Sequence, residues 1–232
     1  MPKVKVPRKS TSVDMTAMCD VAFLLLSFFI LTTSFKPDEA LKVTTPKSVQ
    51  TKAAELKNVV LVTMDKEGKV YFSISDDIGK EKQEAIDVKQ KTIDIVDQQK
   101  KLGLTQAEKK AFLRSGSFVG VPFSQLKQYL GLGPDQIKGL KQSGIPVMDT
   151  LNNEMITWMQ AAQSAFANKT MNLMVKGDSE AKYPSFKGVL DAFKKNELFK
   201  FQMITDQENV PIGTELYKKN QSRGVVQEPA AQ

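Results

Sequence analysis

The feature that most constrains this chain is an apolar stretch close to its N-terminus. Residues 15–35 read MTAMCDVAFLLLSFFILTTSF, and Asp20 is the one charged residue among them. A helix of about 21 residues would be about 31 Å long, which matches the hydrocarbon core of a bilayer. We therefore predict one transmembrane helix over residues 14–35.

The charges before this stretch set the expected orientation. Four basic residues precede it, namely Lys3, Lys5, Arg8 and Lys9. The positive-inside rule then places residues 1–13 in the cytoplasm and the rest of the chain on the other side of the membrane. A cleaved signal peptide is the alternative, but no small-x-small cleavage site follows the stretch. We expect a single-pass protein with a cytoplasmic N-terminus.

Asp20 is the most informative residue of the stretch. An ionised carboxylate at the centre of a membrane helix costs about 2.5–3.5 kcal/mol on insertion scales, so it calls for a specific role. At 100° per residue, Thr16, Ser27 and Ser34 fall within about 40° of Asp20, which predicts one polar stripe that faces protein. Asp20 either holds helices together or takes and releases a proton, which removes the cost of burying its charge. We favour a proton relay formed by Asp20, Thr16, Ser27 and Ser34.

Composition excludes most enzyme classes. The chain has no histidine, and its one cysteine, Cys19, lies inside the apolar stretch. Zinc sites, Ser/His/Asp triads and Cys/His pairs therefore lack their parts, and no nucleophile is paired with a base elsewhere. Although the formal net charge is +7, basic residues are not interleaved with aromatic ones as in a nucleic-acid groove. We expect no enzymatic activity, no metal or cofactor, and no nucleic-acid partner.

Beyond the apolar stretch, the pattern predicts a linker and then a folded domain. Residues 36–57 contain two prolines and many Lys, Thr and Ser residues, as expected of an extended linker. Two β-branched runs at 59–63 and 69–73 flank a turn that ends at Gly68, which predicts a hairpin. A strand at 170–176, a helix that starts near Pro184 and a strand at 199–205 follow. This order predicts an α+β domain at 58–206, a small mixed sheet with helices on one face.

Residues 78–148 are interpreted as a helical insertion into that domain. Helices are predicted at 80–101, after a capping box at Thr105 and Glu108, at 123–130, at 134–142 and, beyond the insertion, at 150–167. The insertion either binds a partner or is a tolerated elaboration. In the last helix, Trp158, Met159 and Phe166 have the spacing of core residues. Residues 207–232 are expected to form a loosely ordered tail.

Three parts of the chain carry a resemblance to a known family. Asp14-Met15-Thr16-Ala17-Met18-Cys19-Asp20 resembles the signature of the ExbD/TolR family, which reads Asn or Asp, apolar, Thr, Pro, two apolar residues and Asp. Thr16 and Asp20 match the threonine and the proton-carrying aspartate, whereas Ala17 replaces the proline. Leu41-Lys42-Val43-Thr44-Thr45-Pro46 is similar to the short extended segment of that family just outside the membrane. The final strand, helix and strand resemble its periplasmic domain.

The resemblance implies a function and partners. It implies a proton-motive-force-driven motor subunit in the bacterial inner membrane that energises outer-membrane transport, with its C-terminal domain in the periplasm. Expected partners are protons, the lipid bilayer, a pentameric ring of multi-span ExbB-like subunits, a second copy in a homodimer, and a TonB-like protein. The segment of Leu41, Lys42, Val43, Thr44, Thr45 and Pro46 would pair with the twin or the TonB-like protein. A TolR-like envelope or gliding role and a passive anchored scaffold are the alternatives.

Overall fold

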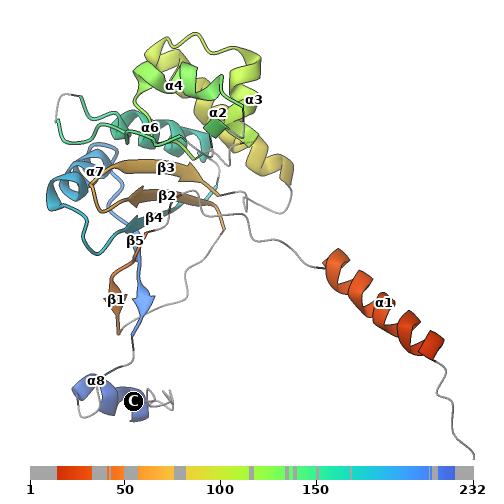
Figure 1. Ribbon diagram of the computed structural model, residues 1–232. Coiled ribbons are helices and arrows are strands. Elements are labelled where there is room, and N and C mark those ends of the chain that lie inside the picture. The colour runs from red at the N-terminus through yellow and green to blue at the C-terminus, as the bar shows by residue number, and fades with distance from the viewer. Residues whose placement is uncertain are drawn as a thin grey trace, which may run out of the picture. The chain divides into compact units, whose positions relative to one another are not determined.

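The chain divides into two compact units, Met1–Glu39 and Ala40–Gln232. The computed structural model describes residues 15–32, 41, 43–49, 57–75, 82–114, 118–133, 136–137, 140–149, 152–167, 169–208, 210 and 214–222. In the first unit, helix α1 covers Met15–Thr32. The second unit holds a four-stranded sheet and its covering helices (Figure 1).

The sheet is mixed, as predicted, with the strand order β3-β2-β4-β5. Strands β2 (Val59–Met64) and β3 (Val70–Ile74) form the antiparallel hairpin, while β4 (Asn172–Gly177) lies parallel to β2 and β5 (Gln202–Ile204) parallel to β4. The hairpin turn requires Gly68, whose φ of +84° is disfavoured for residues with a side chain. Asp65 closes the turn by accepting a hydrogen bond from the Lys69 amide at 2.7 Å.

One face of the sheet forms the core, and the helices of the domain cover it. Alternate strand residues point to this face because successive side chains of a strand alternate; they are Val60, Val62, Met64, Val70, Phe72, Ile74, Leu173 and Val175. The covering helices are α2 (Lys82–Lys100), α3 (Gln106–Arg114), α4 (Phe123–Leu130), α6 (Met155–Ala165) and α7 (Tyr183–Lys195) (Figure 1). The predicted α+β arrangement of the domain is confirmed.

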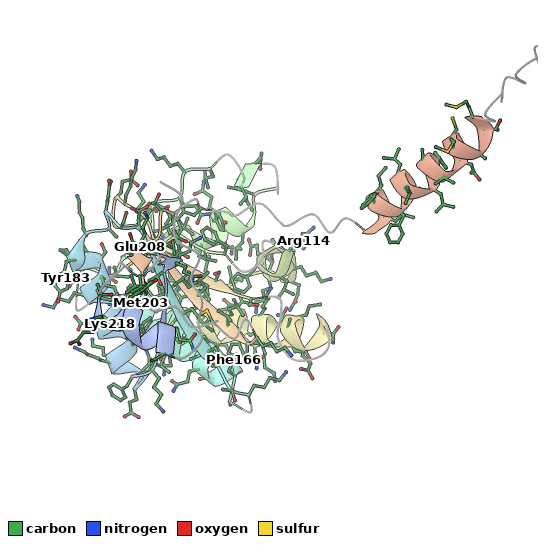
Figure 2. All side chains as sticks on the ribbon, turned by 90° about the horizontal axis from the view of Figure 1, so that it is seen from below. Arg114, Phe166, Tyr183, Met203, Glu208 and Lys218 are labelled. Carbon is green, nitrogen blue, oxygen red and sulfur yellow. The ribbon has the colours of Figure 1, made fainter. Side chains whose placement is uncertain are left out.

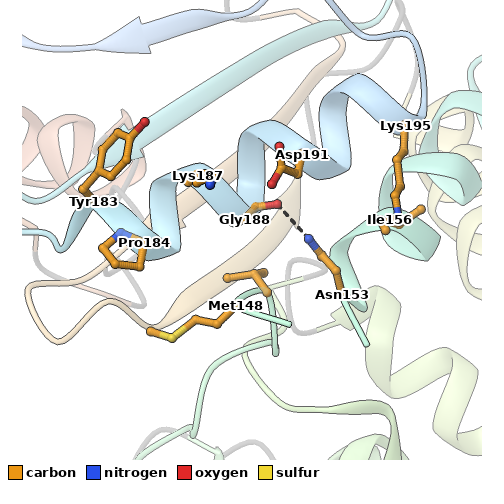
Figure 3. Close-up of a pocket in the computed structure, with 10 residues that line it drawn as sticks. Met148, Asn153, Ile156, Tyr183, Pro184, Lys187, Gly188, Asp191 and Lys195 are labelled. Carbon is orange, nitrogen blue, oxygen red and sulfur yellow. Dashed lines mark hydrogen bonds between the residues drawn. The ribbon is translucent and has the colours of Figure 1, made fainter. Parts of the chain in front are cut away.

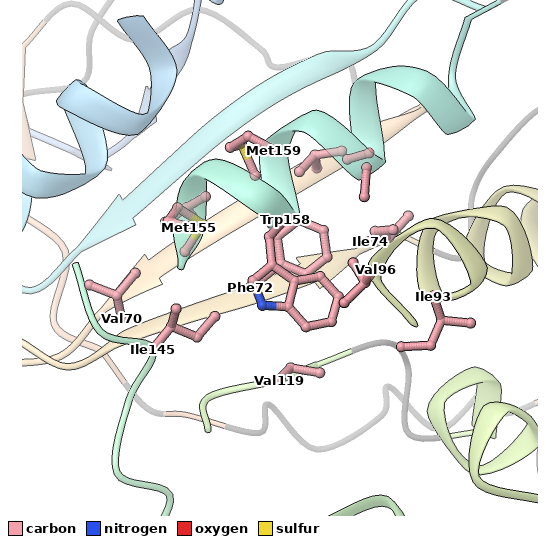
Figure 4. Packing of buried hydrophobic residues seen from close by; sticks show 14 of the residues in the cluster. Val70, Phe72, Ile74, Ile93, Val96, Val119, Ile145, Met155, Trp158 and Met159 are labelled. Atoms are coloured by element: carbon pink, nitrogen blue, oxygen red, sulfur yellow. The ribbon is translucent and has the colours of Figure 1, made fainter. Parts of the chain in front are cut away.

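Trp158 of α6 lies at the centre of this core (Figure 4). Its ring stacks on Phe72 of β3 at a centroid distance of 4.9 Å, on Phe123 at 5.6 Å and on Phe112 at 6.0 Å. Trp158, Met159 and Phe166 are all buried, which confirms their predicted place in the core. Because Phe112 and Phe123 belong to residues 78–148, the segment interpreted as an insertion shares one core with the sheet.

A partly buried ion-pair network joins α2 to α3. Lys109 Nζ lies 2.9 Å from both Asp94 Oδ1 and Asp97 Oδ2, and the side chains of Lys109 and Asp97 are only 13% and 14% exposed. Burial alone raises the pKa of Asp97, but hydrogen bonds from Lys109 and from the Leu104 amide outweigh it and hold that pKa below its usual value. The predicted capping box is also confirmed, since Thr105 and Glu108 bond to each other's amides.

We expect Lys109→Met to destabilise the domain by about 1–3 kcal/mol at pH 7, because it leaves a partly buried carboxylate pair without its cation. A carboxyl group whose pKa is lower in the folded than in the unfolded chain stabilises the folded domain at pH values above its unfolded pKa. This stabilisation is lost as the pH falls through the folded pKa. The difference from the parent chain should therefore shrink below about pH 4. Urea unfolding at several pH values measures this difference in the free energy of unfolding, with the exposed Lys110→Met as the control. A difference that does not change with pH would contradict the role of Lys109 as the cation of this carboxylate pair.

Several predicted boundaries differ from the structure. The helix predicted at 134–142 is wrong over its C-terminal part: residues 140–147 are not helical, and residues 134–135 and 138–139 lie outside the described residues. Gly144 adopts φ +87°, and the Ile145 amide donates to Val70 O at 2.8 Å, so this segment continues along the edge of the sheet. The helix predicted at 150–167 covers only Met155–Ala165, and the strand predicted at 199–205 covers only Gln202–Ile204.

The region predicted as a loose tail contains a helix. Helix α8 covers Glu215–Ser222. Thr214 caps it, since its hydroxyl accepts a hydrogen bond from the Tyr217 amide at 3.2 Å, and Glu215 places an acid in the first turn. This Thr-Glu pair is a sequence signal for a helix start that the prediction missed.

Candidate functional site

Helix α1 presents its apolar side chains outward, with a single carboxylate among them (Figure 2). The large apolar residues from Met15 to Leu31 that are exposed lie on all sides of the helix, and Asp20 is exposed as well. None of the helices that the structure describes is long and apolar enough to cross a membrane.

The structure places three of the four predicted relay residues on α1. Thr16 and Ser27 lie about 6 Å and about 10.5 Å from Asp20 along the helix axis, at 1.5 Å per residue. Ser27 Oγ already donates a hydrogen bond to Leu24 O at 2.9 Å. Ser34 lies outside the described residues.

These spacings limit what α1 does by itself. The side chain of Asp20 makes no hydrogen bond or ion pair with any residue that the structure describes. Leu24 also falls within about 40° of Asp20 and interrupts the polar stripe between Asp20 and Ser27. Ser27 is therefore too far from Asp20 along the helix for direct proton transfer, whereas Thr16 is about one helical turn away.

The second predicted site, residues 41–46, is folded against its own domain. The Thr44 amide donates to Asp178 Oδ2 at 3.0 Å, and the Ser179 amide donates to Thr44 O at 2.8 Å. Thr45 is buried, and Val43 is half-buried. Lys42 lies outside the described residues.

The chain that follows this segment is paired as well. Strand β1 (Lys47–Ser48) runs parallel to β6 (Asp206–Gln207), and the Asp206 amide donates to Pro46 O at 3.0 Å. Leu41 lines a hollow of about 470 Å³ beside the hairpin turn, together with Tyr71 and Phe118. The main chain predicted to pair with a partner is thus used by the domain itself.

Asp178 is a residue of this site that the sequence prediction missed. It follows β4 directly, and its Oδ1 accepts the Glu180 amide at 3.0 Å while its Oδ2 holds Thr44. The hydrogen bonds from the Glu180 and Thr44 amides lower the pKa of Asp178. An Asp directly after a strand, followed by Ser and Glu, is typical of a turn closed by its own side chain, and this was the available signal.

We expect Asp178→Ala to release residues 43–46, because the substitution removes the acceptor for the Thr44 amide. Amide hydrogen exchange at Thr44 and Ser179 should become faster while exchange in β2 and β4 stays unchanged. Because folding lowers the pKa of Asp178, protonation at acidic pH should have the same effect on the parent chain. Glu180→Ala is the matched control, since only its main chain takes part. Unchanged exchange at Thr44 would contradict a role of Asp178 in holding residues 43–46 against the domain.

The described residues contain no group of three or more His, Cys, Asp or Glu side chains placed to hold a metal ion. A buried polar pair does lie in the hairpin, where the Tyr71 hydroxyl donates to Asp65 Oδ2 at 3.1 Å. Burial and then the charge of Asp65 raise the pKa of Tyr71. The same carboxylate closes the hairpin turn, so we interpret this pair as structural.

Comparison with known proteins gives one match. The family model described as biopolymer transport protein ExbD/TolR matches residues 7–208. Neither a curated protein nor a solved structure matches the chain. The matched range contains the motif around Asp20, the segment at 41–46 and strands β2 to β5. Because it covers most of the chain, the protein belongs to the ExbD/TolR family of biopolymer transport proteins.

Proposed function

We propose that this chain is the proton-carrying subunit of an inner-membrane motor that energises outer-membrane transport. The observation that carries the proposal is the lone carboxylate of Asp20 on an otherwise apolar and exposed helix, in a segment that resembles the signature of the family. A charge in such a setting is retained only where it is used or paired. Within the described residues, nothing pairs with it.

The membrane-spanning segment in this proposal is residues 15–35. Helix α1 has 18 residues and is therefore about 27 Å long, a little shorter than the hydrocarbon core of about 30 Å. The sequence stays uncharged to Phe35, and a helix over all of residues 15–35 would be about 31 Å long. The exposed apolar surface of α1 needs lipid or partner helices around it, since a soluble protein rarely exposes so large an apolar area.

The energy available at Asp20 is sufficient for a mechanical step. One elementary charge that crosses a membrane potential of ~150 mV is worth roughly 3.5 kcal/mol. Because Ser27 is bonded within α1 and lies about two turns from Asp20, further proton donors and acceptors would come from partner helices. A ring of multi-span ExbB-like subunits around two copies of this chain would provide them, as the family implies.

The segment at 41–46 would transmit the step to the periplasmic domain. We propose that it pairs with the twin chain or with a TonB-like protein, by main-chain hydrogen bonding to a strand edge. Such pairing requires release from Asp178, Ser179 and β6, which hold this main chain in the structure. Membership of the family supports a TolR-like envelope role equally, because no described residue separates the two.

A topology experiment tests the arrangement. A reporter that is active only in the periplasm should be active when fused after Gln232 and inactive when fused before Pro2, because four basic residues precede the span. A cytoplasm-specific reporter at the same two positions is the control and should give the reverse pattern. Activity of the periplasmic reporter at the N-terminus would place the domain in the cytoplasm and remove the partners proposed here. Function of the Asp20→Asn variant then tests the relay itself.

A further inference from the structure

Helix α7 exposes a face that combines lysines with an aromatic ring. At 100° per residue, Tyr183, Lys187 and Lys194 fall within about 40° of one another on the side away from the core. The Tyr183 side chain is 69% exposed, and it points away from the domain (Figure 2). The residues of this helix that face the core are Ser185, Gly188, Val189, Ala192 and Phe193.

The chain on either side of α7 extends this surface. Lys182 precedes the helix, Lys195 is its last residue and Lys200 follows it, all of them exposed. Phe199 is 73% exposed in the turn after the helix. We call Lys182, Tyr183, Lys187, Lys194, Lys195, Phe199 and Lys200 the α7 basic surface. Only two acidic residues, Asp191 and Glu197, occur between residues 182 and 200. The surface is therefore net positive and has an exposed aromatic ring near each end.

A hollow of about 410 Å³ borders this surface (Figure 3). Tyr183, Lys187 and Lys195 line it from α7, and Val147, Met148 and Ile156 line it from the facing segments. The two walls are held together by the Asn153 side chain, which donates to Gly188 O at 2.7 Å. Met148 is 65% exposed at the rim. The hollow thus has apolar walls together with two lysines and one carboxylate, Asp191, so its charged lining is net positive.

We propose that the α7 basic surface binds anionic phospholipid headgroups of the membrane in which the chain is anchored. This rests on the proposed membrane-spanning segment. Lysine clusters bind anionic lipid at about 1 kcal/mol per residue near the surface, and exposed aromatic rings favour the headgroup region.

The tether brings this surface within range of the bilayer. While Thr44 stays bonded to Asp178, only residues 36–43 connect the proposed span to the domain. At 3.3–3.6 Å per residue these eight residues reach at most about 30 Å. An acidic protein segment is the competing occupant, but the spacing of lysines and rings over a whole helix favours an extended anionic surface.

The test uses the full chain in nanodiscs of phosphatidylcholine alone or with phosphatidylglycerol, both containing acyl-brominated lipid that quenches nearby tryptophan. The reporter is Phe199→Trp, and Ile86→Trp, an exposed position on α2, is the control site. The only natural tryptophan, Trp158, is buried and is subtracted as background. We expect quenching at position 199 in anionic discs that falls in high salt, and little quenching at position 86.

Charge reversal separates the outcomes. Lys187→Glu with Lys194→Glu should lower the ratio of docked to free domain by about thirtyfold, as the loss of two lysine contacts implies. Lys91→Glu with Lys110→Glu, two exposed lysines on α2 and α3, should leave it unchanged. Equal quenching in neutral and anionic discs, or insensitivity to the α7 reversal, would overturn the proposal. Failure of the chain to co-elute with the discs would instead overturn the membrane anchor on which the proposal rests.

Discussion

Asp20→Asn is expected to abolish energy-dependent function while the protein stays inserted and associated with its membrane partners. Asparagine keeps the size and shape of the side chain but cannot exchange a proton, so the step driven by the membrane potential is lost. Asp20→Glu, which keeps the carboxyl group, should retain part of the activity. Uptake through an energised outer-membrane receptor measures the function, and co-purification with the ring measures assembly.

The neighbouring hydroxyls should matter less than the carboxylate. Ser27→Ala with Ser34→Ala is expected to weaken function only partly, because Ser27 Oγ is already bonded to Leu24 O and lies about 10.5 Å from Asp20 along the helix. Full activity of Asp20→Asn would remove the motor mechanism and leave Asp20 as a residue that fixes helix pairing. Loss of ring association in the same variant would point to that structural role as well.

The elements with strong local signals were the ones that the sequence predicted well. Alternating β-branched residues around a turn that ends in Gly68 indicated the hairpin, and the register pairs Val62 with Phe72. Pro184 lies in the first turn of α7, as a helix start requires. The α4 boundaries at Phe123 and Leu130 agree with the prediction. In each case, the residues that decide the structure are close together in the sequence.

The parts that depend on distant residues were not predictable in the same way. Residue 44 is bonded to residue 178, and β1 pairs with β6 across about 160 residues, so no local pattern reports either contact. Residues 140–147 were predicted as partly helical, but the Ile145 amide is satisfied by Val70 O at the sheet edge. The motif singled out Asp20 as a candidate, whereas the turn signal at Asp178 did not show that its side chain would hold Thr44, which is 134 residues away.

Residues 78–148, interpreted as an insertion, show most clearly that local patterns do not predict contacts between distant residues. Its helices were predicted from local signals, but their packing was not. Phe112 and Phe123 stack on Trp158, and Trp158 stacks on Phe72 of the hairpin. The core of the domain is therefore built jointly from the sheet, α6 and this segment, which sequence periodicity alone cannot show.

Trp158→Ala is expected to destabilise the domain by about 3–5 kcal/mol, because it removes a fully buried ring from between three aromatic partners and leaves a cavity. Trp158→Phe should cost less, since Trp158 Nε1 is buried without a hydrogen-bond partner among the described residues and phenylalanine removes this unpaired group. Tyr183→Ala, at an exposed position, should change stability by less than about 0.5 kcal/mol.

Urea unfolding of the full chain followed by far-UV circular dichroism measures these changes, because the substitutions remove the only tryptophan and with it the fluorescence signal. A shift of the midpoint with an unchanged slope would assign the loss to the folded domain. If Trp158→Ala lowered the free energy of unfolding by less than about 1 kcal/mol, the three stacking contacts of Trp158 would contribute much less to stability than a buried aromatic residue normally does. Residues 78–148 would then be an independent elaboration, as the sequence alone suggested. A loss in the expected range instead makes α3 and α4 part of the same cooperative unit as the sheet.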